Sequence, residues 1–153
     1  MGIEAVNYSV YGARACFLQR IAAWSCVSVI PKIALEGSSY FALHTTDYWI
    51  DLELAHDSAA GARLSIRIAL CNKVAVLDIL RRLLRDVQTE CAGVVVDEQS
   101  GCNYKALPDD VWQEIVSRYE QRYQQFQVWF GDRHFAVSAD DVWALVNGSA
   151  GEQ

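Results

Sequence analysis

The chain has 153 residues, of which 52% are hydrophobic and 21% are charged, and its formal net charge at pH 7 is −6. This length fits one domain with a self-sufficient core, and the composition excludes an intrinsically disordered chain. The negative charge argues against a nucleic-acid binder and suits a basic partner. We therefore expect a single domain over 1–147 and a flexible tail over 148–153.

The N-terminus and the cysteines predict a cytoplasmic protein. Residues 1–10 lack the positive region and apolar core of a signal peptide, and no stretch is apolar enough to span a bilayer, so we expect no membrane contact. The cysteines are odd in number, irregularly spaced and without a Cys-x-x-Cys pair, which favours free buried thiols in a reducing compartment. They are Cys16, Cys26, Cys71, Cys91 and Cys102.

Apolar spacing in the first third of the chain predicts one helix and two strands. Apolar residues from Val10 to Trp24 recur at steps of three and four, which predicts an amphipathic helix over 10–24. A short strand is expected over 27–30, and Pro31 would confine it to a sheet edge. Aromatic and β-branched residues then predict a strand over 40–45.

The strongest pattern in the chain is a pair of alternating runs over 48–55 and 63–70. Apolar and polar residues alternate in both runs, and the residues between them are turn formers. This pattern predicts a β-hairpin with one buried face and one wet face.

The second half of the chain predicts further helices and a second hairpin. Asn72 is a suitable N-cap for a helix over 73–87, and 94–96 is typical of a buried strand. Pro108 suits the first turn of a helix over 108–125. Strands over 126–130 and 134–137 would flank the turn at 131–133. Ser138 would cap a short final helix that carries Val142, Trp143 and Val146.

The order of these elements predicts the fold class. Clustered strands joined by hairpins favour an antiparallel sheet, and the interspersed helices favour packing mainly on one of its faces. We therefore expect an α+β domain.

Asp51 and Glu53 form the most distinctive polar pattern, because alternation places them on one face of the first hairpin strand. In the simplest register Asp51 lies opposite Arg67, and Glu53 has Arg63 and Arg67 as diagonal neighbours. Three interpretations follow: a solvated ladder of ion pairs, an acidic strip that recognises a partner, or general acid/base catalysis. Opposing arginines would keep both carboxylates ionised, which disfavours catalysis.

Other candidate contact residues lie close to this strip or in a loop. Regular alternation places Trp49 on the acidic face, where an exposed indole would anchor an interface unless a bulge or a helix buries it. Asp97 and Glu98 lead into a loop of turn residues with an aromatic, as binding loops often do. The predicted partner-binding residues are Trp49, Asp51, Glu53, Asp97 and Glu98.

Motifs for catalysis or cofactor binding are not found in the sequence. It contains neither a glycine-rich phosphate loop nor a Gly-x-Ser-x-Gly segment, so no cofactor is expected. The histidines, His44, His56 and His134, are too dispersed to predict a metal site. A Cys–His pair formed in space, for example Cys71 with His44, remains open as a nucleophile and its base.

The overall plan of the chain resembles small immunity proteins that neutralise toxins delivered by type VI secretion or contact-dependent inhibition in bacterial competition. The segments that carry the likeness are 48–54, 64–72 and 134–143. The resemblance implies a small, acidic, non-enzymatic antitoxin that binds and inhibits a cognate toxin in the cytoplasm by protein–protein contact. Immunity proteins have many folds, so the resemblance assigns no binding residues.

The sequence leaves two alternative functions open. Small acidic type III secretion chaperones are also α+β, and they usually bind an effector as dimers. A small hydrolase that uses a cysteine or a carboxylate is the alternative from another class. An exposed apolar helix face would favour the chaperone, and a deep pocket holding a histidine beside a thiol or carboxylate would favour the enzyme.

Overall fold

The computed structural model describes residues 5–31, 37–57, 61–131 and 136–142. In chain order the elements are β1 (Ala5–Gly12), α1 (Arg14–Ala23), β2 (Val27–Ile30), β3 (Ser38–His44), β4 (Trp49–Asp57), β5 (Gly61–Ala69), α2 (Val76–Cys91), β6 (Val94–Asp97), β7 (Asn103–Tyr104), α3 (Asp109–Phe130) and the 3₁₀ helix η1 (Ala139–Asp141).

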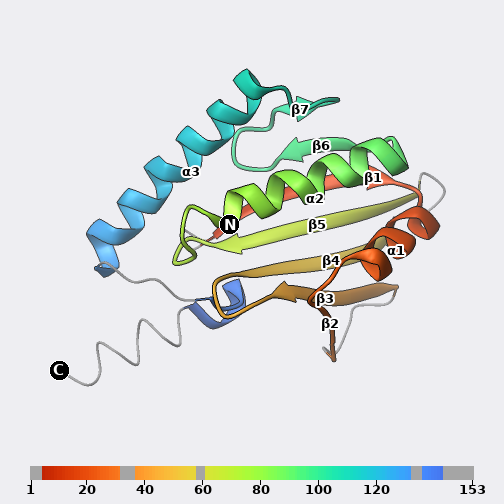
Figure 1. Cartoon of the computed structure of the whole chain (residues 1–153), viewed down its shortest axis with the longest axis horizontal. Coiled ribbons are helices and arrows are strands. Elements are labelled where there is room, and N and C mark those ends of the chain that lie inside the picture. The colour runs from red at the N-terminus through yellow and green to blue at the C-terminus, as the bar shows by residue number, and fades with distance from the viewer. Residues whose placement is uncertain (1–4, 32–36, 58–60, 132–135, 143–153) are drawn as a thin grey trace.

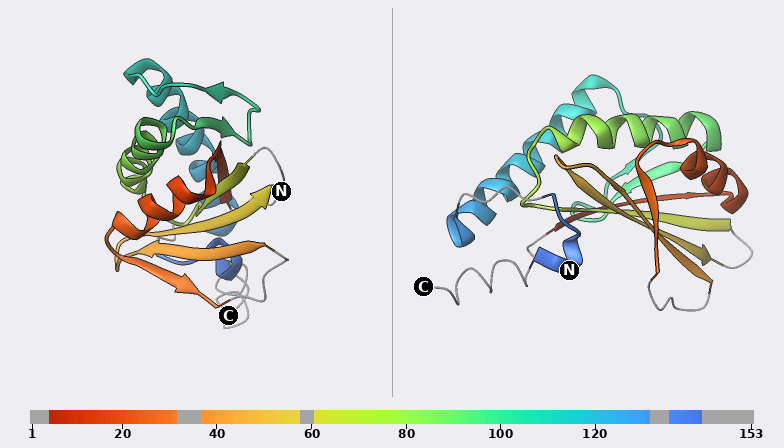
Figure 2. Two further views of the ribbon diagram at one scale, coloured as in Figure 1. Left: turned by 90° about the vertical axis from the view of Figure 1, so that its right-hand side faces the viewer. Right: turned by 60° about the horizontal axis from the view of Figure 1, so that its bottom comes forward.

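The strands form one antiparallel sheet in the order β2-β3-β4-β5-β1-β6-β7. Helices α1 and α2 lie across one face of the sheet, and α3 packs beside α2 toward the β6–β7 end (Figures 1 and 2). The predicted α+β fold is therefore confirmed. The edge position expected for the strand over 27–30 is confirmed as well, since β2 is the outermost strand on its side.

The hairpin of β4 and β5 has the predicted register. Leu52 pairs with Ile66, which sets Asp51 opposite Arg67 and Glu53 opposite Ser65. The apolar side chains of both strands face the helices and are fully buried, namely Ile50, Leu52, Leu54, Leu64, Ile66 and Ile68. The stabilisation gained by burying apolar groups scales with the area removed from water. The burial of this face therefore contributes strongly to the stability of the fold.

The start of the chain corrects the predicted helix over 10–24. Residues 5–12 form β1, which pairs with β5 on one side and β6 on the other, and the helix begins only at Arg14. Val6, Tyr8 and Val10 alternate toward the core and are buried. Pairing with two strands that are distant in sequence determines this conformation, so only the start of the predicted helix is wrong. The helix itself is confirmed over Arg14–Ala23, where Phe17 and Ile21 are its buried residues.

The predicted second hairpin is also wrong in its first arm. Helix α3 continues through Phe130, and Gly131 ends it with a positive φ of 83° and an N–H that donates to the carbonyl of Gln127. Phe126 and Phe130 lie one turn apart with ring centroids separated by 4.9 Å, so they extend the apolar stripe of the helix. Residues 132–135 of the predicted hairpin, including His134, lie outside the described residues.

Two further predictions at element ends have mixed outcomes. Asn72 is not an N-cap: it is fully buried four residues before α2, where its Nδ2 donates to the carbonyl of Ala69. Ser138 does cap a helix, because its Oγ accepts from the N–H of Asp140 at the start of η1. Trp143, Val146 and the tail over 148–153 lie outside the described residues.

The cysteines correct the expectation of five free thiols. Cys16 and Cys91 form a disulfide that joins α1 to the C-terminal end of α2 across 75 residues of sequence. Of the free cysteines, Cys71 is buried, whereas Cys26 and Cys102 are exposed. The sequence spacing gave no sign of this pair, because the two helices meet only through the tertiary fold.

Candidate functional site

The sheet face opposite α1 and α2, which we call the open face, carries the polar residues of the strands. The pairing of β1, β5 and β4 aligns Asn7, Arg67 and Asp51 in one row across the sheet. Ser65, Glu53 and Tyr40 form the next row through β5, β4 and β3. These side chains and Asp140 line a depression of about 270 Å³.

Asp51 fastens the segment 138–141 onto the open face. Its carboxylate accepts hydrogen bonds from Ser138 Oγ at 2.9 Å and from the Ala139 N–H at 2.8 Å. Trp49 Nε1 donates to the same carboxylate at 2.9 Å. A carboxylate that accepts from several donors is held in one orientation. Asp51 therefore has a structural role within this chain, which the sequence pattern did not indicate.

Arg67 pairs with the same segment. Its Nη1 lies 3.0 Å from Asp140 Oδ1, and both side chains are partly exposed. The register predicted for Asp51 and Arg67 is correct, yet the expected ladder of ion pairs is redirected toward the residues around η1. An exposed pair of this kind contributes about 0–1 kcal/mol, so it orients the segment more than it stabilises the fold.

Glu53 is the carboxylate on this face that is available to a ligand. It is half-buried between Tyr40 and Ser65 in its row. In the part of the chain that the structure describes, it has no hydrogen-bond or ion-pair partner. Three carboxylates and one guanidinium line the depression, so its charge is negative overall. Such a site favours a cationic group.

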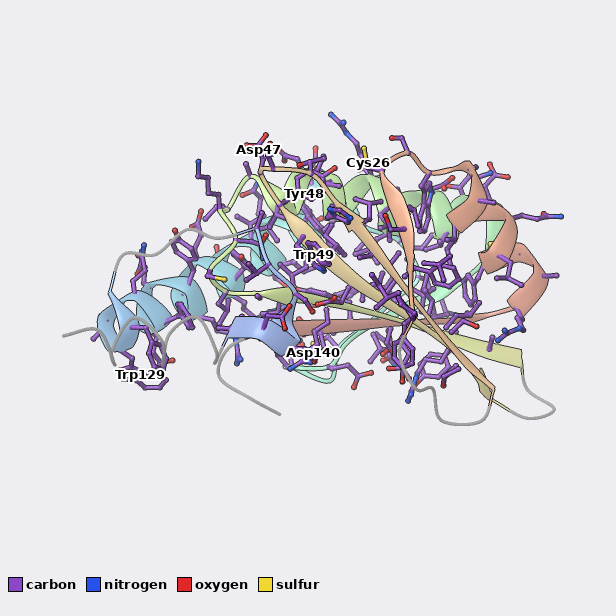
Figure 3. All side chains as sticks on the ribbon, turned by 90° about the horizontal axis from the view of Figure 1, so that it is seen from below. Cys26, Asp47, Tyr48, Trp49, Trp129 and Asp140 are labelled. Atoms are coloured by element: carbon purple, nitrogen blue, oxygen red, sulfur yellow. A yellow bond between two sulfur atoms is a disulfide. The ribbon has the colours of Figure 1, made fainter. Side chains whose placement is uncertain are left out.

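Trp49 is neither freely exposed nor covered by a helix. It is half-buried and stacks on His44, with ring centroids 4.2 Å apart and an interplanar angle of 19°. Its backbone N–H donates to Asn72 Oδ1 at 2.9 Å. Figure 3 labels Trp49 between Tyr48 and Asp140. Its indole is thus locked at the edge of the open face, where it presents a rigid aromatic surface.

Asp97 and Glu98 have opposite environments. Asp97 is only 2% exposed, accepts from the Gln99 N–H at 2.9 Å and lies 3.4 Å from Arg118 Nη2. This burial removes Asp97 from the predicted contact residues, because its carboxylate organises the loop. Glu98 is exposed, and its N–H donates to the carbonyl of Asn7 at the border of the open face. Glu98 therefore remains a candidate.

Burial affects the chemistry of two tyrosines on the helix-covered side. Tyr8 lies near Asp97, and burial raises the pKa of its phenol well above the ordinary value. Tyr119 donates to the carbonyl of Asn72 at 2.9 Å, and burial again raises its pKa. Both hydroxyls stay protonated over the physiological range, so they act as packing and hydrogen-bonding groups.

The residues considered for catalysis are not assembled into a familiar arrangement. His44 Nε2 lies 3.4 Å from Ser28 Oγ at an exposed position, whereas Cys71 is buried. No carboxylate orients the His44 ring in the described part of the chain, although a nucleophile–base pair usually needs a third group. Among residues 5–31, 37–57, 61–131 and 136–142, no group of three His, Cys, Asp or Glu is arranged to hold a metal ion.

Sequence reasoning missed several residues of this face. Asn7 belongs to β1, a strand that the sequence analysis did not predict. Tyr40 lies in a predicted strand whose two faces were not assigned. Asp140, which lines the depression beside them, was not among the predicted contact residues. The alternation of Val6, Tyr8 and Val10 was the signal that places Asn7 on the open face.

Of the helices in the described ranges, none combines the length and the hydropathy needed to span a bilayer. Comparisons with protein-family models, with curated proteins and with solved structures find no match for this chain.

Proposed function

We propose that this protein is a non-enzymatic immunity protein, which binds a cognate bacterial toxin through its open face and thereby inhibits it. The observation that carries the proposal is Glu53, a half-buried carboxylate in a concave, negatively charged depression, with no partner among the described residues. A Lys or Arg side chain of the toxin would fill this depression and pair with Glu53.

The surroundings of Glu53 support binding more than catalysis. Asp51 is engaged by Ser138 and Ala139, so the two carboxylates do not form a pair that shares one task. The segment fastened by Asp51 makes one wall of the depression through Asp140. A wall held by hydrogen bonds is preorganised, which lowers the entropic cost of binding.

The charge of the whole chain supports the same partner chemistry. A net charge of −6 would steer the protein toward a basic surface and raise the association rate, especially at low salt. Toxins that act on nucleic acids or nucleotides present basic clefts, and the overall resemblance to immunity proteins favours such a partner. Trp49 and Glu98 at the borders of the open face would extend the contact.

The compartment is a separate part of the proposal. The sequence predicts the cytoplasm, whereas a disulfide such as Cys16–Cys91 is typical of oxidising compartments. Acid quenching of intact cells, followed by alkylation of the denatured protein and mass spectrometry, discriminates between them, because denaturation makes the buried Cys71 accessible. Five modified thiols place the chain in a reducing compartment, and three modified thiols, on Cys26, Cys71 and Cys102, place it in an oxidising one.

The decisive experiment uses the product of the neighbouring reading frame as the candidate toxin. We expect the two proteins to co-purify, and co-expression to rescue the growth of cells that the candidate toxin arrests. Charge reversal by Glu53→Lys should weaken the complex at least tenfold and abolish rescue. Glu114→Lys is the matched control, because Glu114 is exposed on α3, away from the depression.

The outcomes separate the parts of this proposal. If the complex forms and Glu53→Lys leaves its affinity unchanged, the open face is not the interface. If the neighbouring product is toxic but neither binds nor is neutralised, the proposed immunity function is wrong for that pair.

A secretion chaperone is the second candidate, and one observation favours it. Val128 and Trp129 are 82% and 51% exposed near the end of α3, which leaves an apolar patch on that helix. A chaperone of this type would use the patch for dimerisation or for an unfolded effector segment. Sedimentation measures the difference: a stable dimer that Trp129→Ala dissociates supports the chaperone, and a monomer that binds a folded toxin excludes it.

A further inference from the structure

A second depression, of about 480 Å³, lies on the other side of the molecule. It is bounded by the C-terminal end of α1, one face of α2 and the chain just before β4, and we call it the helix-side cleft. Leu43, Ile79 and Leu83 line its apolar part, and Trp24 and Tyr48 add two aromatic rings. The cleft shares no lining residue with the depression on the open face.

Part of the polar lining of this cleft is already paired. Asp86 on α2 accepts from Arg20 Nε at 2.9 Å and from Trp24 Nε1 at 2.5 Å. The ion pair with Arg20 neutralises the carboxylate of Asp86, and the hydrogen bond from Trp24 fixes the position of its indole. Asp86 therefore serves to hold α1 and Trp24 against α2, and it does not repel an anion that approaches the cleft.

Arg82 is the cation that remains available. It is exposed on α2 at the border of the cleft, and it has no hydrogen-bond or ion-pair partner among the residues that the structure describes. Asp78, one turn earlier on the same helix, does not pair with it. Tyr48 lines the same cleft and is half-buried. Burial raises the pKa of its phenol, and the nearby charges of Arg82 and Asp47 act on this pKa in opposite directions. A guanidinium and a neutral phenol thus stand beside an apolar floor.

We propose that the helix-side cleft binds an acidic segment of a partner protein, with an apolar side chain between Trp24 and Tyr48 and a neighbouring carboxylate on Arg82. The cleft has the size and mixed lining of a ligand site, and Trp, Tyr and Arg are the residue types enriched at interface hot spots. Arg forms strong hydrogen bonds with carboxylates. The proposal does not depend on the open face, which would select groups of the opposite charge.

The test uses a defined probe, the blocked peptide acetyl-Asp-Leu-Phe-Glu-amide, and follows the Trp24 indole and the Ile79 methyl resonances by NMR. We expect both resonances to shift with millimolar peptide and to saturate. The Arg82→Glu variant should bind at least tenfold more weakly. Lys105→Glu is the matched control, because it makes the same charge change at an exposed residue that does not line the cleft, and it should alter binding less than twofold.

The remaining arms address the chemistry and the identity of the occupant. A peptide with lysine in place of both acidic residues should not shift these resonances, and equal binding of the two peptides would overturn the proposal. It is also overturned if the acidic peptide shifts neither resonance, or if Arg82→Glu, with an otherwise unchanged amide spectrum, binds as well as the native chain. Shifts that depend on protein concentration without peptide would assign the cleft to a second copy instead.

Discussion

The two faces of the sheet are formed by the same strands, but their side chains depend on different partners. On the helix-covered face, Leu52, Leu64 and Ile66 are at most 1% exposed, and any well-packed apolar neighbour satisfies them. On the open face, Asp51 requires directional donors, which come from Ser138 and Ala139 more than 80 residues away in sequence. The helix-covered face therefore contributes stability without specific partners. The open face forms a shaped polar surface only when the segment 138–141 is bound to Asp51.

The largest effect should come from the helix-covered face. Ile66→Ala would remove a fully buried side chain from the centre of the core and should lower the free energy of unfolding by about 2–5 kcal/mol. Ser65→Ala, the adjacent residue on the open face, should change it by less than about 0.5 kcal/mol. Urea denaturation measures both variants, and similar losses for the two would contradict the division between the faces.

The disulfide should have the next largest effect, because it joins two helices of the layer that covers the core. Replacing both Cys16 and Cys91 by serine should cost about 2–4 kcal/mol, since the cross-link restricts the unfolded chain. The control is Cys102→Ser, which changes an exposed free thiol and should leave the unfolding midpoint unchanged.

A smaller effect is expected at Asp51 on the open face. Asp51→Ala would leave the donors on Ser138 and Ala139 without their acceptor and should cost about 1–3 kcal/mol. Hydrogen exchange at the Ala139 amide should accelerate while exchange in β4 and β5 changes little. If hydrogen exchange accelerated uniformly throughout the sheet, Asp51 would stabilise the core as well as the segment 138–141.

The smallest effect on stability should be at Glu53, where we expect function and stability to separate. Glu53→Gln removes a charge that has no partner in the described ranges, so the free energy of unfolding should change by less than about 0.5 kcal/mol. The affinity for a basic toxin should fall nonetheless, because a charge-assisted hydrogen bond is lost. A marked loss of stability in this variant would show that Glu53 serves the fold.

Local patterns were sufficient for the parts of the fold that depend on periodicity. Alternation over 48–55 and 63–70 predicted the hairpin and its register, because a slip of one residue would expose every apolar side chain. The apolar stripe over 73–87 predicted α2, although the helix begins later and ends one turn further on. The same alternation placed Asp51 and Glu53 on the open face, which was the correct part of the candidate site.

Only the tertiary structure decided the features that join distant parts of the chain. Residues 5–12 became a strand because β5 and β6 pair with it, and Asp97 became a loop anchor because Arg118 lies beside it. In the hairpin of β4 and β5 and in α2, the sequence by itself determined which side chains face the core, because the burial of apolar groups is favourable and needs no specific partner atom. The partners of the polar groups were decided by contacts across the fold, because a hydrogen bond or a disulfide requires two specific atoms to meet.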